Sequence, residues 1–127
     1  MVNLLLDSHA FLWWDEERGL ARTALDLIAD PSNRIYVSVA SIWELAQKRR
    51  SGRLRFDGSI VGAIRRNGFA ELAITGEDAE AAGNLDWAHR DPFDRMIVAQ
   101  AQRRGFTLVT AERTMQAFIG VAQVAAT

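Results

Sequence analysis

One stretch decides the fold: Asp91-Pro-Phe-Asp-Arg-Met-Ile-Val-Ala-Gln-Ala-Gln-Arg-Arg104. Gly105 and the short strand-like run Thr107-Leu-Val109 follow it. An aspartate before a proline is typical of a helix start, because the carboxylate caps free N–H groups and proline fits the first turn. Phe93, Ile97 and Ala101 then recur at helical spacing, and glycine commonly ends a helix. We therefore predict a helix over 92–104 that leads into a buried strand.

Strand and helix signals alternate over the rest of the chain. Short apolar runs predict strands at 2–6, 35–39, 69–74, 107–109 and 121–124, and periodic segments between them predict helices. Such alternation favours a mostly parallel sheet with helices on both faces. We expect an α/β fold of about five strands, a three-layer α/β/α sandwich in which residues 1–127 form a single domain.

Composition excludes several classes of protein. There is no cysteine, so neither a disulfide framework nor a thiolate zinc site can form. No apolar run approaches the roughly 18 residues of a membrane span, and the N-terminal run lacks the basic flank of a signal peptide. We therefore expect a soluble cytoplasmic protein. With a formal net charge of −1, the chain is not a bulk electrostatic binder of nucleic acid.

Acidic residues stand where the predicted strands end or where the following helices begin. Asp7 ends the first strand, Glu44 lies in the first turn of the helix after the second, and Glu112 follows the fourth. Asp91 and Asp94 begin the long helix. Each has an ordinary structural explanation, as an N-cap or as a charge that complements a helix dipole. Glu44 also forms a Ser-x-x-Glu capping-box pattern with the serine three residues before it.

Taken together, these acids point to chemistry. In an open parallel sheet the ligand site lies beyond the carboxyl ends of the strands, where the strand order reverses. Two unit charges about 4 Å apart cost roughly 4 kcal/mol at an effective dielectric near 20, whereas a cap contributes only about 1 kcal/mol. A converging cluster therefore needs protonation or a cation. Hard oxygen ligands favour Mg²⁺ or Mn²⁺, and carboxylate-held Mg²⁺ usually serves phosphate chemistry.

Four segments resemble the PIN domain, and in particular the VapC ribonuclease toxins of bacterial toxin–antitoxin pairs. They occur in the family's order, extend over nearly the whole chain, and the third is the most specific. The segments are Leu4-Leu-Leu-Asp-Ser-His-Ala10, Ser38-Val-Ala-Ser-Ile-Trp-Glu-Leu45, His89-Arg-Asp-Pro-Phe-Asp-Arg-Met-Ile-Val-Ala99 and Leu108-Val-Thr-Ala-Glu112.

The resemblance implies a metal-dependent endoribonuclease that uses Mg²⁺ or Mn²⁺. The family's acidic positions fall on Asp7, Glu44 and Asp94, which are the principal catalytic and metal-binding candidates. The family's fourth acid is usually aspartate, and here it is Glu112, one methylene longer. Additional candidates at the site are Asp91, Glu112 and Thr110. The resemblance also implies RNA as substrate, a homodimer, and a cognate antitoxin that blocks the site.

Basic and aromatic residues supply the remaining candidates. Lys48 is the only lysine among fifteen basic residues, and arginine forks suit bidentate contact with phosphate. Cations near helix C-termini are also explained as solvated charges that complement the helix dipole. An exposed apolar groove for the antitoxin or the second subunit would most readily use Trp13 or Trp14, and Phe93 could stack on a base. The candidates for contact with RNA are Arg90, Arg95, Lys48, Arg49 and Arg50.

Two other functions stay open at this point. A receiver-like phospho-acceptor domain also places acids around Mg²⁺ at strand ends, but it uses a lysine late in the chain, whereas Lys48 lies early. A PIN-like module that binds RNA or protein with weak or no cleavage is the other, and Glu112 is the feature that favours it. Acetyl phosphate labelling would reveal the first, and an RNA cleavage assay separates the second from a nuclease.

Overall fold

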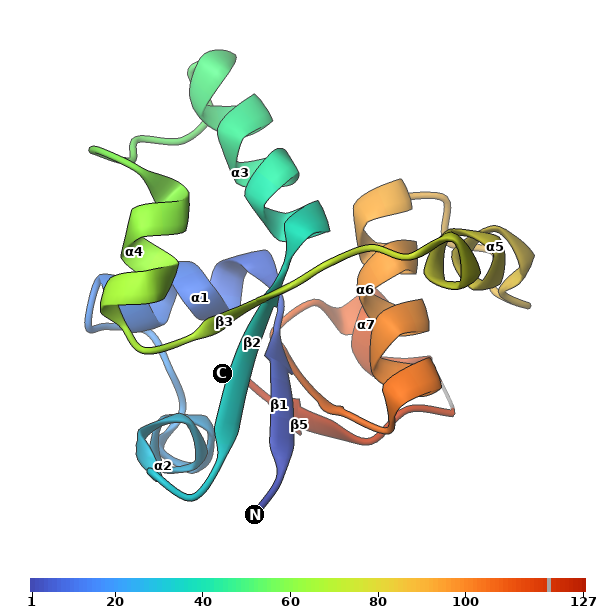
Figure 1. Ribbon diagram of the computed structural model, residues 1–127, viewed down its shortest axis with the longest axis horizontal. Helices are drawn as coiled ribbons and strands as arrows, with labels where there is room; N and C mark the ends of the chain where they lie inside the picture. The colour runs from blue at the N-terminus through green and yellow to red at the C-terminus, as the bar shows by residue number, and fades with distance from the viewer. Residues whose placement is uncertain (119) are drawn as a thin grey trace.

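A computed structural model describes residues 1–118 and 120–127 and places five strands in one sheet (Figure 1). All neighbouring strands are parallel, in the spatial order β3-β2-β1-β4-β5. The predicted α/β class and five-stranded parallel sheet are therefore confirmed. The strands are β1 (Asn3–Leu6), β2 (Arg34–Ser38), β3 (Ala70–Leu72), β4 (Thr107–Thr110) and β5 (Gln123–Ala125).

Helices cover both faces of this sheet. Leu4 and Leu6 belong to a core that includes residues of α1 to α4, whereas Leu5, pointing the other way, packs with α6 and α7. Figure 1 shows α1, α2 and α4 on one side of the strands and α5 to α7 on the other, with α3 continuing from β2 beyond the carboxyl end of the sheet. The helices are α1 (Ser8–Asp15), α2 (Arg22–Ala29), α3 (Val39–Arg50), α4 (Ile60–Arg66), α5 (Gly76–Asn84), α6 (Pro92–Arg104) and α7 (Arg113–Gln116).

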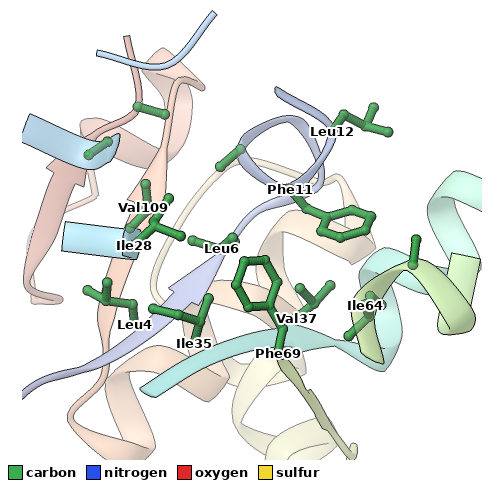
Figure 2. Packing of buried hydrophobic residues seen from close by; sticks show 14 of the residues in the cluster. Leu4, Leu6, Phe11, Leu12, Ile28, Ile35, Val37, Ile64, Phe69 and Val109 are labelled. Carbon is green, nitrogen blue, oxygen red and sulfur yellow. The ribbon is translucent and has the colours of Figure 1, made fainter. Parts of the chain in front are cut away.

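The larger core lies between the sheet and α1, α2 and α4 (Figure 2). Phe11 of α1 is fully buried there, and its ring meets the edge of the Phe69 ring at a centroid distance of 6.5 Å. β1 is buried on both faces, as a strand in the middle of a parallel sheet must be. No helix of the described residues is long and apolar enough to cross a membrane.

The strand order reverses beside β1. The chain moves outward from β1 through β2 to β3, and then returns to the other flank of β1 with β4. The carboxyl ends of β1 and β4 therefore meet at the topological switch point, where such sheets bind ligands. Flavodoxin-like sheets, to which receiver domains belong, have the order 2-1-3-4-5. The receiver-like alternative is thus excluded.

Helix α6 begins and ends where the sequence predicts. Asp91 Oδ1 accepts hydrogen bonds from the backbone N–H groups of Phe93 and Asp94, at 2.9 and 3.0 Å. At the other end Gly105 adopts φ +65°, the left-handed conformation that suits glycine. These local signals place Asp94 in the first turn of α6.

Helix α3 begins at Val39, earlier than a helix with Glu44 in its first turn would begin. β2 runs into it without a loop, and Ser38 is its N-cap, with Oγ accepting from the Ala40 N–H at 3.0 Å. The predicted capping box of Ser41 and Glu44 is wrong, because Ser41 lies inside the helix. Glu44 therefore stands in the second turn rather than the first. The predicted strand over 69–74 is also shortened to β3, and the last strand begins at Gln123.

A buried polar network joins β2, α5 and α6, and the sequence analysis missed it. The Ser38 hydroxyl donates to Gln100 Oε1 at 2.6 Å, and Gln100 Nε2 donates to Asp78 Oδ2 at 3.2 Å. Arg103 and Arg104 donate to the same carboxylate. Burial alone raises the pKa of Asp78, but these hydrogen bonds outweigh it and hold the pKa well below its ordinary value. The network fixes α6 against the start of α3.

Candidate active site

A cavity of about 200 Å³ lies at the switch point of the sheet. All five acids singled out in the sequence line it, although they are spread from position 7 to position 112. The structure therefore brings these side chains together, and their catalytic roles stay predictions. The lining residues are Asp7, Ser8, His9, Glu44, Lys48, His89, Asp91, Asp94, Glu112 and Met115.

Asp7 follows β1 directly and is 2% exposed. Its Oδ1 accepts from the Ala10 N–H at 2.7 Å, so it is the N-cap of α1. Its Oδ2 is buried and has no hydrogen-bond partner among the described residues. Burial raises the pKa of Asp7, and the nearby Thr110 hydroxyl offsets part of that rise. A buried carboxylate oxygen without a partner is costly, so this atom suits a cation.

Glu44 has a partner for each of its oxygens. The Ser8 hydroxyl donates to Oε1 at 2.5 Å, and Lys48 Nζ lies 3.3 Å from Oε2. Lys48 is four residues further along α3, the spacing at which two helical side chains meet. Lys48 therefore forms part of the cavity wall and neutralises Glu44, whereas Arg49 and Arg50 are exposed at the end of α3.

Asp94 and His89 form a second pair. His89 Nε2 lies 2.7 Å from Asp94 Oδ2, with the imidazole carried by the segment before α6. Burial raises the pKa of Asp94 to about 6, and repulsion from Asp91 and Glu44 adds to the rise, against the hydrogen bond to His89. The carboxylates of the cavity thus act on one another, as the convergence argument requires.

Of the additional candidates, Asp91 and Glu112 line the cavity, whereas Thr110 is buried at the end of β4. Asp91 Oδ1 caps α6 by accepting hydrogen bonds from the backbone N–H groups of its first turn. Glu112 lies just before α7, makes no capping hydrogen bond, and places Oε1 3.3 Å from His9 Nδ1. Thr110 is fully buried, and its hydroxyl accepts from the Glu112 N–H at 2.9 Å. Thr110 therefore fixes the turn that brings Glu112 to the cavity.

No three His, Asp or Glu side chains of the described residues stand close enough together to hold a metal ion. Lys48, His89 and His9 lie against carboxylate oxygens that a metal would use. The donor set itself fits Mg²⁺ or Mn²⁺: it consists of carboxylates, and the buried Asp7 Oδ2 lacks a partner. A cation would compete with the internal pairs for these oxygens.

Arg95 contributes to the site through the backbone. Its guanidinium donates to five backbone carbonyls between positions 82 and 89, including that of His89 at 2.9 Å. A guanidinium has five N–H donors, so none is left for a phosphate. These contacts do not support the predicted contact of Arg95 with RNA. They hold the segment that presents His89 to Asp94.

The other basic candidates differ in their surroundings. Arg49 donates to the carbonyls of Phe56 and Gly58, at 3.2 and 2.7 Å, and so ties the loop after α3 to the helix. Arg50 and Arg90 are exposed. Contact of these arginines with RNA stays a prediction.

A family model for the PIN domain matches residues 4–119. The chain belongs to the PIN-domain family. Ribonuclease VapC22 of Mycobacterium tuberculosis is 29% identical in an alignment 121 residues long, which covers 91% of this chain and 92% of that protein. A DNA-bound VapBC crystal structure from Salmonella typhimurium superposes with a TM-score of 0.68 at 17% identity over 100% of both chains. A toxin–antitoxin complex from Klebsiella pneumoniae gives 0.68 at 20% identity over 98% of both.

The sequence analysis did not identify several side chains that pair with the acids of the cavity. The pairing of Glu44 with Lys48 could have been found from their i, i+4 spacing. Both histidines lie against acids of the cavity: His89 forms a hydrogen bond with Asp94, and His9 Nδ1 lies 3.3 Å from Glu112 Oε1. Ser8 carried no signal of its own, because its contact with Glu44 spans 36 positions.

The raised pKa of Asp94 predicts the pH dependence of stability in metal-free protein. A carboxyl whose pKa rises from 3.8 to about 6 on folding binds its proton more tightly in the folded chain. The free energy of unfolding should therefore fall as pH rises from about 4 to about 6. We expect Asp94→Asn to flatten this fall, measured by urea unfolding in EDTA across that range. Asp57→Asn, at an exposed position outside the cavity, should keep the wild-type profile.

Arg95→Lys should destabilise the PIN domain by about 1.5–3 kcal/mol, because lysine cannot satisfy the same set of carbonyls. The measurement is urea unfolding of both proteins at pH 7. Arg90→Lys, at an exposed neighbouring position, should stay within about 0.5 kcal/mol of wild type. An Arg95→Lys protein as stable as wild type would show that these hydrogen bonds do not hold the segment.

Proposed function

We propose that this PIN domain is a metal-dependent endoribonuclease, a VapC-like toxin that cuts RNA phosphodiester bonds and is inhibited by a cognate antitoxin. The observation that carries the proposal is the meeting of Asp7, Glu44 and Asp94 in one cavity at the switch point. The similarity to Ribonuclease VapC22 over most of both chains supports RNA as the substrate.

The cofactor of this reaction is Mg²⁺ or Mn²⁺. Asp7, Glu44 and Asp94 would hold it, with Asp91 and Glu112 as further oxygen donors on the rim. When bound, the divalent ion polarises the phosphate, lowers the pKa of water and stabilises the leaving oxygen. Among the described residues, the buried Asp7 Oδ2 has no hydrogen-bond partner that a cation would have to displace.

The protein side chains orient these acids and balance their charge. Ser8 fixes one oxygen of Glu44, and His89 fixes one oxygen of Asp94. Lys48 brings a positive charge into the cavity, where it attracts the phosphate of the substrate as well as Glu44. The exposed Arg49, Arg50 and Arg90 are the proposed contacts for more distant phosphates.

The purified protein should cleave single-stranded RNA with Mn²⁺ or Mg²⁺ and stop when EDTA is added. Asp94→Asn should remain folded and lose at least about 100-fold in cleavage rate, because one oxygen donor to the cation is replaced by a weaker neutral amide. Cleavage is followed on a labelled RNA, and folding is checked by circular dichroism.

The control is Asp57→Asn, which should cleave at the wild-type rate. Equal rates for Asp94→Asn and wild type would reject the assignment of the site. Tight RNA binding without cleavage under any divalent ion would instead favour the non-catalytic PIN-like module, for which the paired state of Glu44 and Asp94 is the supporting observation.

The proposed toxin is a homodimer, so a second copy of the chain is one of its partners. Val39 and Trp43 of α3 are 36% and 62% exposed, and the Trp43 ring meets the edge of the Phe93 ring of α6 at 5.1 Å. Exposed apolar side chains gathered on two adjacent helices are typical of a protein interface. We place the homodimer contact on this surface.

Trp43→Glu should convert the dimer to a monomer, because it sets a charge into the centre of the apolar contact. Light scattering coupled to size-exclusion chromatography measures the mass. Val2→Glu places the same charge on an exposed valine at the amino end of the sheet, and should remain a dimer. A dimer that survives Trp43→Glu would move the interface elsewhere.

The antitoxin is assigned to another surface. A hollow of about 450 Å³ beside α1 has apolar walls from Trp13, Trp14, Leu20 and Leu25, and carboxylates on its rim. Such a hollow suits a segment with apolar and basic side chains. The similarity in fold to toxin–antitoxin complexes supports a protein partner of this kind.

A further inference from the structure

A second hollow opens beside the acid cavity, and the proposed cleavage reaction makes no use of it. Its volume is about 420 Å³, and it shares His9 and Glu112 with the acid cavity. The two spaces therefore adjoin at the paired side chains of these residues, whose Nδ1 and Oε1 atoms are 3.3 Å apart. The hollow is lined by His9, Trp13, Ala111, Glu112, Arg113 and Thr114.

One wall of the hollow is aromatic. The His9 and Trp13 rings lie one turn apart on α1, with centroids 5.7 Å apart and planes tilted by 35°. The backbone of Gly19 holds the indole in place from behind, since a Cβ at position 19 would lie only 3.0 Å from Trp13 Cγ. Gly19 also has φ +92°, which disfavours any side chain there. The absence of a side chain at position 19 thus lets the backbone pack closely against the Trp13 ring.

The opposite wall is polar and positively charged. Arg113 begins α7 and is exposed, and within residues 1–118 and 120–127 its side chain has neither an ion pair nor a hydrogen bond. Thr114, the next residue of α7, also lines this hollow. Glu112, the one acid in the lining, has an oxygen already directed at His9. A guanidinium without an internal partner is suited to bidentate contact with a phosphate.

We propose that this hollow binds one nucleotide of the RNA strand next to the scissile phosphate, with its base against His9 and Trp13 and its phosphate on Arg113. The proposal rests on the proposed function. An aromatic wall, an available guanidinium and continuity with a phosphate-processing cavity together match a nucleotide. A peptide with apolar side chains is better matched by the hollow at Trp14, Leu20 and Leu25.

Binding of a fluorescein-labelled single-stranded RNA hexamer in EDTA tests this subsite without cleavage. Arg113→Gln should weaken binding several-fold and reduce the slope of log affinity against log salt by about 0.7, the value for one phosphate contact on a single strand. Trp13→Leu should weaken binding at least about fivefold, and Trp13→Phe should restore most of the loss, because a ring still stacks. Arg34→Gln, at the amino end of β2, is the matched control and should change neither quantity.

Each result decides between distinct conclusions. An unchanged affinity and salt slope in Arg113→Gln, in a wild-type protein that binds and cleaves RNA, overturns the subsite and leaves the nuclease. A wild-type protein that neither binds nor cleaves RNA rejects the proposed function itself. If the hexamer binds all variants equally while Arg113→Gln weakens binding of the co-expressed antitoxin, the hollow belongs to a protein partner and the nucleotide proposal fails. Loss of affinity that Trp13→Phe does not restore would reject stacking.

Discussion

Repulsion among carboxylates at the carboxyl ends of β1 and β4 is the constraint on which the site depends. Five acids line one small cavity, and the raised pKa values of Asp7 and Asp94 record what their burial costs. For Glu44 and Asp94 the fold offsets this cost with a group close in sequence, whereas the partner of Glu112, His9, is distant in sequence. Lys48 stands one helical turn from Glu44, and His89 precedes Asp94 by five residues. The fold thus brings acids that are distant in sequence into one cavity, and the groups paired with them reduce the electrostatic cost of placing them there.

A rigid frame keeps these pairs in register. Ser38 caps α3 and donates to Gln100 of α6, so the helix that carries Glu44 is tied to the helix that carries Asp94. Asp78 then links α6 to α5 through Arg104. Arg95 adds a further tie, because one of the backbone carbonyls to which its guanidinium donates is that of His89. Each tie is a buried or half-buried polar contact, which is more directional than apolar packing and so fixes helix positions closely.

The parts of the fold that the sequence could predict are those decided locally. Helix α6 has a cap, a proline and a terminal glycine within its own segment, so both of its ends were correct. The start of α3 was misplaced because Ser38 and Ser41 both fit an N-cap. Ser38 is the N-cap in the structure, and its hydroxyl also donates to Gln100, which is 62 positions away in the sequence. Local sequence carries no information about such a partner.

The candidate site, too, could be predicted only in part. The convergence of the acids could be predicted, because strand order and the position of each acid relative to a strand end suffice to place them at one edge. The pairing of His9 with Glu112 and the contacts of Arg95 depend on loop paths that no periodicity describes. These unpredicted partners also decide how the cavity works. In the proposed enzyme a divalent ion must compete with Lys48 for Glu44, and a displaced ammonium would lie beside the phosphate that the ion recruits. Internal charge compensation and substrate binding would then use the same side chain at different times.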